Sequence, residues 1–203
     1  MINNIKKIIL SKSLDGYVLP KNDKYFTEYS KTNNLKLVSK FSGSAGFALI
    51  MKNKNYLFVD GRYTLQAKKQ SGSKFIICEI PHIWPKDIFR KLNIKLNIGF
   101  DPKLFTYSRL YSYFENSCNL LSINQNLFEN KKKISKNNNF YILNDKIVGE
   151  SIKSKINRIV KLLVKKKINY SYISAGENIC WLLNIRGKDL PNSPVANCKM
   201  ILT

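Results

Sequence analysis

Short apolar runs alternate with segments of helical periodicity along the first 123 residues. Strands are predicted at 16–19, 45–51, 56–59, 75–80, 97–100 and 120–123, and helices at 1–12, 62–70, 85–92 and 106–116. Asn22 or Asp23 would cap a further helix, which carries Tyr25, Phe26 and Tyr29 on one face. A turn at 53–55 joins two strands into a hairpin. This alternation predicts an α/β domain with a mixed sheet flanked by helices.

The second part of the chain follows a polar, basic stretch, 129–139 (ENKKKISKNNN), which is typical of a linker. Beyond it, strands are predicted at 140–143, 170–174 and 195–203, with helices at 149–167 and 177–184. The longer helix is amphipathic, with Ile152, Ile156, Ile159, Val160 and Leu163 on one face. We therefore predict a domain at 1–128, a linker at 129–139, and at 140–203 the first part of a second, truncated domain of similar type, since residues 200–203 resemble an interrupted strand.

The composition is that of a folded protein, with 44% hydrophobic and 12% aromatic residues. No apolar run approaches the roughly 20 residues needed to cross a bilayer. The apolar stretch near the N-terminus is too short for a signal peptide, and no small-residue cleavage site follows it. These features predict a soluble, cytoplasmic protein without a membrane partner.

The net charge of +22 has two interpretations. A basic face would attract nucleic acid through its phosphates. Alternatively, Lys, Asn and Ile dominate the whole chain together, as an AT-rich genome would produce. The lysines are spread out, and Arg, which provides the bidentate fork of base and phosphate readers, is scarce. We favour the second interpretation and expect no specific nucleic-acid partner.

Cysteine and histidine provide no metal site of an ordinary kind. Cys78, Cys118, Cys180 and Cys198 are far apart in the sequence, without a C-x-x-C pair, and His82 is the single histidine. Buried free thiols are the expected state of the four cysteines. We predict no catalytic and no metal-binding residue in this chain.

Three ordered segments carry a family resemblance. They are 15–20 (DGYVLP) with 27–29 (TEY); 41–46 (FSGSAG) with 59–63 (VDGRY) and 65–67 (LQA); and 179–189 (ICWLLNIRGKD) with Pro194-Val195. Weaker support comes from 98–102 (IGFDP) and from 149–151 (GES) with Lys155. Together they resemble the creatinase-type N-terminal region of Xaa-Pro aminopeptidases, from about Asp15 to the last residue.

The resemblance implies a metal-dependent hydrolase that removes an N-terminal residue preceding proline. Its two divalent ions, Mn or similar, would lie in a third domain following Thr203, and no residue here matches their ligands. We therefore expect this chain to be the non-catalytic N-terminal portion of a homodimeric enzyme. It would bind no cofactor, would be inactive alone, and would supply scaffold, dimer contacts and part of the cleft for the peptide substrate. The alternative is a non-catalytic peptide- or protein-binding module of the same fold.

Arg62 is the candidate substrate-binding residue. It follows a predicted strand, and ligand groups tend to gather at strand ends in α/β sheets. The resemblance implies that it contacts the peptide substrate; the alternative is a structural ion pair with Asp60 or another acid. Gly43 and Gly46 are expected to shape the start of a strand rather than to hold phosphate, because no helix follows them. Trp181 is expected in the core of the second domain.

Overall fold

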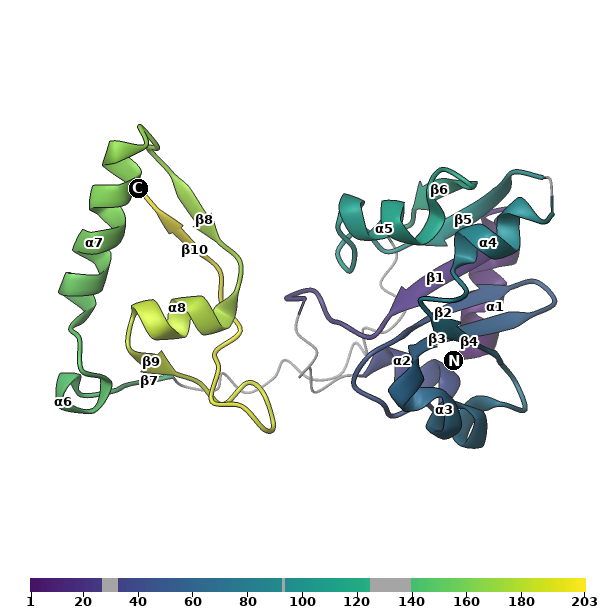
Figure 1. Cartoon of the computed structure of the whole chain (residues 1–203), viewed down its shortest axis with the longest axis horizontal. Helices are drawn as coiled ribbons and strands as arrows, with labels where there is room; N and C mark the ends of the chain where they lie inside the picture. Colours follow the sequence, from purple (N-terminus) through teal and green to yellow (C-terminus); the bar gives the residue numbers. More distant parts are fainter. Residues whose placement is uncertain (27–32, 93, 125–139) are drawn as a thin grey trace. The chain divides into compact units, whose positions relative to one another are not determined.

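The computed structural model describes residues 1–26, 33–92, 94–124 and 140–203 (Figure 1). The chain divides into two compact units. Unit 1 comprises Met1–Lys24 and Thr32–Asn130, and unit 2 comprises Tyr25–Lys31 and Lys131–Thr203. The predicted linker at 129–139 and the motif at 27–29 lie outside the described residues.

Unit 1 is built on a six-stranded sheet with the order β4-β3-β2-β1-β5-β6. The strands are β1 (Gly16–Pro20), β2 (Phe47–Met51), β3 (Asn55–Asp60), β4 (Ile76–Ile80), β5 (Leu96–Phe100) and β6 (Cys118–Ser122). The pairs β1–β2 and β2–β3 are antiparallel and the other three are parallel, so the predicted mixed sheet is confirmed. The helices are α1 (Ile2–Ser11), α2 (Asn34–Ser39), α3 (Thr64–Ser71), α4 (Pro85–Arg90) and α5 (Tyr107–Phe114), with a 3-10 helix at Gly61–Tyr63.

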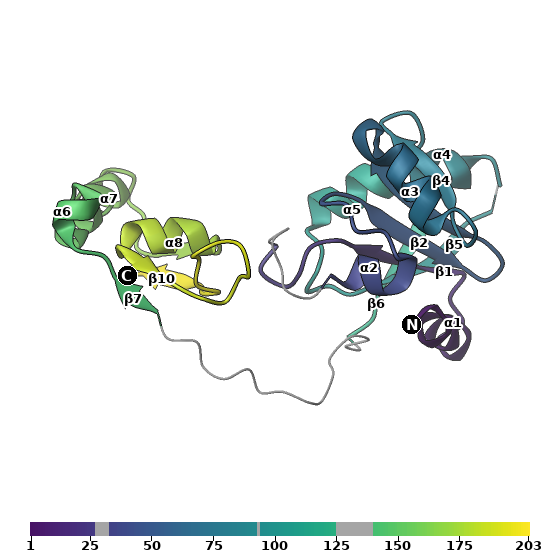
Figure 2. The same ribbon diagram turned by 90° about the horizontal axis from the view of Figure 1, so that it is seen from below.

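The core of unit 1 lies on both faces of the sheet, because α1 and α4 cover opposite sides (Figure 2). All five residues of the central strand β1 are buried, as expected for a strand covered on both faces. On β2, the Phe47 ring stacks on Tyr113 of α5 at 4.0 Å and on its cross-strand partner Phe58 at 4.6 Å. Such aromatic stacking adds to the free energy of simple burial.

The two glycines before β2 shape the start of this strand, as predicted. Gly46 has a φ of 142°, and a Cβ there would lie 2.8 Å from the carbonyl oxygen of Phe58. A Cβ on Gly43 would lie 2.2 Å from the ring of Phe41. Only glycine allows the backbone to pack this closely at both positions.

The prediction of a helix after Asn22 or Asp23 is wrong within the described residues, since residues 21–26 are not helical. The Asn22 side chain instead donates to the carbonyl oxygen of Leu104 at 2.9 Å and accepts from Nη1 of Arg109 at 2.8 Å. The helix in this part of the chain is α2, which the sequence analysis missed. Asn33 caps it by accepting from the backbone N–H of Lys36.

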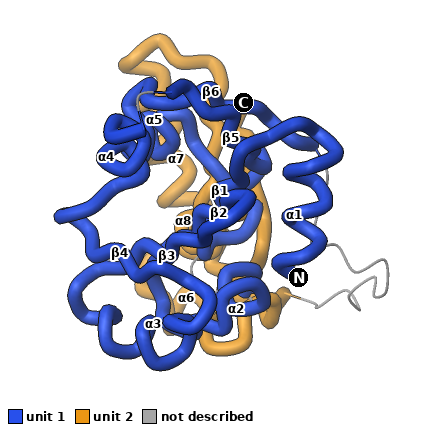
Figure 3. The backbone as a smooth tube through the Cα atoms, turned by 90° about the vertical axis from the view of Figure 1, so that its right-hand side faces the viewer, with its two compact units in different colours: residues 1–24, 32–130 blue, residues 25–31, 131–203 orange. Residues whose placement is uncertain are grey.

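Unit 2, orange in Figure 3, has shorter elements and a smaller core. Its helices are α6 (Asp145–Val148), α7 (Ile152–Lys165) and α8 (Gly176–Leu182), and its strands are β7 (Tyr141–Ile142), β8 (Ser171–Ile173), β9 (Ile185–Arg186) and β10 (Met200–Leu202). Strands β8 and β10 form one antiparallel pair, and β7 and β9 form another. A buried cluster of Cys180, Ile185 and Ala196 packs against Leu183, Val195 and Cys198.

The difference between the two cores predicts a difference in local stability. Amide hydrogen exchange should be slow within residues 45–59, where β2 and β3 are largely buried, and fast within residues 170–203. Exchange measured by mass spectrometry on the intact chain tests this expectation. Equal protection in the two segments would contradict it and would mean that unit 2 is as stable as unit 1.

Candidate functional site

The 59–63 motif (VDGRY) lies where β3 ends and the 3-10 helix begins. Strands β3 and β4 are parallel, with Asp60 opposite Ile80, so their carboxyl ends lie at one edge of the sheet. Asp60 caps the 3-10 helix, because its Oδ1 accepts from the backbone N–H of Arg62 at 3.0 Å. This local geometry directs the Arg62 side chain back over the Asp60 carboxylate.

Arg62 combines features of both interpretations drawn from the sequence. Its Nε donates to Oδ1 of Asp60 at 3.1 Å and its Nη2 to Oδ2 at 2.8 Å, which makes a bidentate ion pair. Hydrogen bonds from Arg62 hold the pKa of Asp60 below its usual value. Yet 75% of the Arg62 side chain is exposed, so the pair lies at the surface and contributes little to folding.

The loop at 41–46 is tied to this site by hydroxyl and amide groups. Ser44 Oγ and Tyr63 Oη are 2.7 Å apart, and either could be the donor. Ser42 Oγ accepts from Nε2 of Gln66 at 3.0 Å and from Nε2 of Gln70 at 2.9 Å. The residues of the second sequence motif therefore converge at one end of β3, although they come from three separate segments.

Glu79 and His82 lie beside the same strand ends. His82 Nε2 is 3.8 Å from Oε1 of Glu79, and the position of a Cβ on Gly61 lies 3.2 Å from that oxygen. The sequence analysis did not connect His82 with any carboxylate. Among the residues that the structure describes, no three His, Cys, Asp or Glu side chains converge as a metal ion requires. The described residues thus do not fit a two-metal centre.

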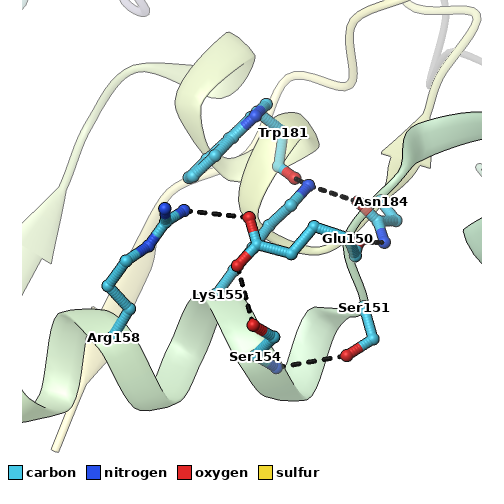
Figure 4. Close-up of polar contacts among 7 residues, drawn as sticks. All are labelled: Glu150, Ser151, Ser154, Lys155, Arg158, Trp181 and Asn184. Atoms are coloured by element: carbon cyan, nitrogen blue, oxygen red, sulfur yellow. Dashed lines mark hydrogen bonds and ion pairs between the residues drawn. The ribbon is translucent and has the colours of Figure 1, made fainter.

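A second polar cluster lies in unit 2, around the buried side chain of Lys155 (Figure 4). Lys155 is 3% exposed, and its Nζ donates to the carbonyl oxygen of Trp181 at 2.8 Å and to Oδ1 of Asn184 at 2.6 Å. The ammonium also lies 4.4 Å from the centre of the Trp181 ring. A carbonyl, an amide oxygen and an aromatic face thus stabilise this buried charge.

Asn184 connects this lysine to the turn before α7. Its Nδ2 donates to the carbonyl oxygen of Glu150 at 3.0 Å, and its backbone adopts a φ of 51°. The Glu150 side chain bonds Arg158 at 3.0 Å and Ser154 at 2.8 Å (Figure 4). Sequence reasoning used Lys155 only as weak family support and assigned no role to Asn184. The hydrogen bonds of Lys155 and Asn184 fasten α7 to the end of α8.

The expected burial of Trp181 is wrong, because 49% of this residue is exposed. One face of its ring covers the Lys155 ammonium, and the Arg158 guanidinium lies 5.7 Å from the ring centre. The buried residues of α8 are instead Ile179, Cys180 and Leu182. The Trp181 ring therefore packs on the Lys155 ammonium and not in an apolar core.

Comparison with known proteins places these features in a family. A family model described as the creatinase/prolidase N-terminal domain matches residues 1–127, and a second model with the same description matches residues 130–203. The chain belongs to the creatinase/prolidase N-terminal family. Both units of the structure are therefore covered by matches to one type of domain.

Its relatives include Xaa-Pro aminopeptidases. The chain is 27% identical to Xaa-Pro aminopeptidase 1 of Dictyostelium discoideum, over 96% of this chain and 34% of that protein. It is 30% identical to a Neosartorya fischeri protein named "Probable Xaa-Pro aminopeptidase P", over 98% of this chain and 33% of the relative. The chain spans about a third of the length of the curated relatives it matches.

A solved structure is also similar. The X-prolyl aminopeptidase of Caenorhabditis elegans, described as a cytosolic enzyme with a di-nuclear active site, matches with a TM-score of 0.81 and 26% sequence identity. The match covers 94% of this chain and 33% of that enzyme.

In the described part of this chain, none of the helices has the length and apolarity of a membrane span.

The Lys155 cluster predicts a selective loss of stability. Lys155→Ala should lower the free energy of unfolding by about 1–3 kcal/mol, because Oδ1 of Asn184 would be left buried without the hydrogen bond from Lys155. Lys153→Ala, on the exposed side of the same helix, should change it by less than about 0.5 kcal/mol. Denaturant unfolding of both variants measures the difference, and equal effects would contradict the role assigned to Lys155.

Proposed function

We propose that this chain is the N-terminal, non-catalytic region of an Xaa-Pro aminopeptidase, a metallopeptidase that releases the residue preceding proline. The observation that carries the proposal is the match of nearly the whole chain to about a third of such enzymes. The region supplies scaffold and part of the rim of the cleft that receives a peptide with proline at its second position.

The domain organisation forms part of the proposal. Residues 1–128 are a first creatinase-type domain, 129–139 a linker, and 140–203 the first part of a second domain of the same type. Support comes from the two family matches, which meet between residues 127 and 130, and from the division of the chain into units near residue 130. The catalytic part would hold two divalent ions, Mn or similar, in accordance with the di-nuclear site named for the C. elegans enzyme.

The cellular location and the oligomeric state of the enzyme are also part of the proposal. The description of the C. elegans relative as cytosolic supports a cytoplasmic location. A homodimer is proposed, with contacts from this region. Exposed apolar side chains support such contacts in unit 2, where the cross-strand partners Tyr172 and Ile201 are both exposed.

Arg62 is the proposed substrate-contacting residue. Its guanidinium is exposed at the carboxyl ends of β3 and β4, and the bidentate pair with Asp60 holds it in one orientation. An oriented and exposed guanidinium is suited to donate further hydrogen bonds to a peptide carbonyl or carboxylate oxygen. The surrounding hydrogen bonds of Ser42, Ser44 and Tyr63 fix the loop next to it.

The proposal predicts that the isolated chain does not hydrolyse Xaa-Pro peptides, because its described residues lack a convergent set of metal ligands. The test incubates the purified chain with Mn²⁺ and a proline-containing peptide. Turnover that survives repurification and that a chelator abolishes would overturn the proposed non-catalytic role.

Arg62→Ala should weaken catalysis in an enzyme that carries this chain ahead of a catalytic domain. The loss of one charge-assisted contact is worth about 1.5–3 kcal/mol, or roughly one to two decades in kcat/KM. The melting temperature should change little, since the side chain is exposed.

Arg90→Ala is the matched control for this measurement. Arg90 is also an exposed, ion-paired arginine of unit 1, with Glu115 as its partner at 2.8 Å. The Arg90→Ala substitution should leave both kcat/KM and the melting temperature nearly unchanged. A destabilised Arg62→Ala enzyme with unaltered kcat/KM would assign Arg62 a structural role only.

A further inference from the structure

Two of the four cysteines lie together in unit 2. Cys180 is on α8 and Cys198 precedes β10, and both belong to the same small apolar cluster around Ala196. All four cysteines of the chain are free thiols in this structure. The sequence analysis treated them as unrelated because 17 residues separate this pair.

The backbone of Ala196 brings the two sulfur atoms together. The N–H of Ala196 donates to Sγ of Cys180 at 3.3 Å, and Sγ of Cys198 donates to the carbonyl oxygen of Ala196 at 3.4 Å. Burial first, then the neighbouring Cys180 and Asp189 side chains, raise the pKa of Cys198. Two thiols that bond the backbone of the same residue within one small cluster are placed near each other, as an intramolecular disulfide requires.

The other two cysteines lack this arrangement. Cys78 is on β4 and Cys118 on β6, the two outer strands of the six-stranded sheet. At about 4.8 Å per strand they are roughly 24 Å apart, far beyond the reach of a disulfide. Burial raises the pKa of Cys78 to about 11 and of Cys118 to about 12. The distance between them is therefore what sets these two thiols apart from Cys180 and Cys198, since burial raises the pKa of Cys198 as well.

We propose that Cys180 and Cys198 are a redox-responsive dithiol that hydrogen peroxide converts into an intramolecular disulfide. Cys198 is the more exposed of the two and attacks the peroxide as its thiolate, forming a sulfenic acid and releasing hydroxide. Cys180 then attacks the sulfenic sulfur and water leaves. Two thiols and one peroxide thus yield one disulfide and two waters, with the sulfurs oxidised and the peroxide reduced.

The bond would join α8 to the segment that leads into β10. The loop it closes contains β9, the hydrogen bond from Gly187 N–H to Pro194 O, and the bond from Asn197 N–H to Asp189. Since this unit has a small apolar core, a covalent link across it should restrain the loop strongly. The rigidity of the 179–189 motif would therefore depend on whether Cys180 and Cys198 are reduced or joined in a disulfide.

The test treats the reduced, intact chain with hydrogen peroxide, alkylates the remaining thiols, and maps peptides under non-reducing conditions. The expected product is a monomer with a Cys180–Cys198 cross-link, while Cys78 and Cys118 stay alkylated. The double variant Cys78→Ser and Cys118→Ser should form the same bond. Cys198→Ser should form none.

The oxidised chain should also melt about 10 °C above the reduced chain, as expected for a closed loop of this length. Treatment with dithiothreitol should reverse the change. The proposal is overturned if the pair remains reduced, if the two thiols oxidise separately to sulfinic acid, or if the cross-link forms between chains. If the Cys180–Cys198 disulfide forms and the melting temperature does not change, the inference that the disulfide restrains the loop is wrong.

Discussion

The pairing of β2 with β3 is the constraint on which the candidate site in unit 1 depends. Phe47 faces Phe58 across the two strands and stacks on it, while Gly46 lets the backbone approach the Phe58 carbonyl. A shift by one residue would turn every side chain of β3 to the other face of the sheet. The register therefore fixes where β3 ends, and with it the position of Asp60 and Arg62.

The motif residues around this strand end have unequal roles. Ser42, Gln66 and Gln70 bond one another, and Ser44 bonds Tyr63, so their polar groups are engaged in holding the loop. Arg62 differs because its ion pair leaves most of its side chain exposed. The loop residues thus provide a fixed frame, and the arginine is the group through which this frame can meet a ligand.

Unit 2 is held together in a different way. Its apolar cluster is small, and the best-buried residue of α7 is a lysine rather than an isoleucine. A buried ammonium is costly unless its donors are satisfied, and Trp181 and Asn184 provide the partners. Such polar packing is specific in geometry, because each partner must lie within hydrogen-bonding distance. It fastens helices α7 and α8 without a large hydrophobic core.

The sequence by itself determined the elements with strong local signals and the family. Apolar runs bounded by turn residues located most strands, and the periodicity of Ile152, Ile156 and Ile159 located α7, because these signals depend on neighbours in the chain. Ordered motifs indicated the creatinase-type family, which the comparisons then established. The end of β3 and the exposed arginine that follows it were also within reach of local reasoning.

The tertiary structure alone decided what depends on residues distant in sequence. Asn22 bonds Leu104 and Arg109 instead of capping a helix, and Lys155 occupies the space beneath the Trp181 ring, which leaves that ring half exposed. Cys180 and Cys198 come together in the same way, because both sulfur atoms bond the backbone of Ala196. Local patterns report which side chains prefer burial, but the partner that satisfies a polar group or covers a ring is chosen by the folded chain.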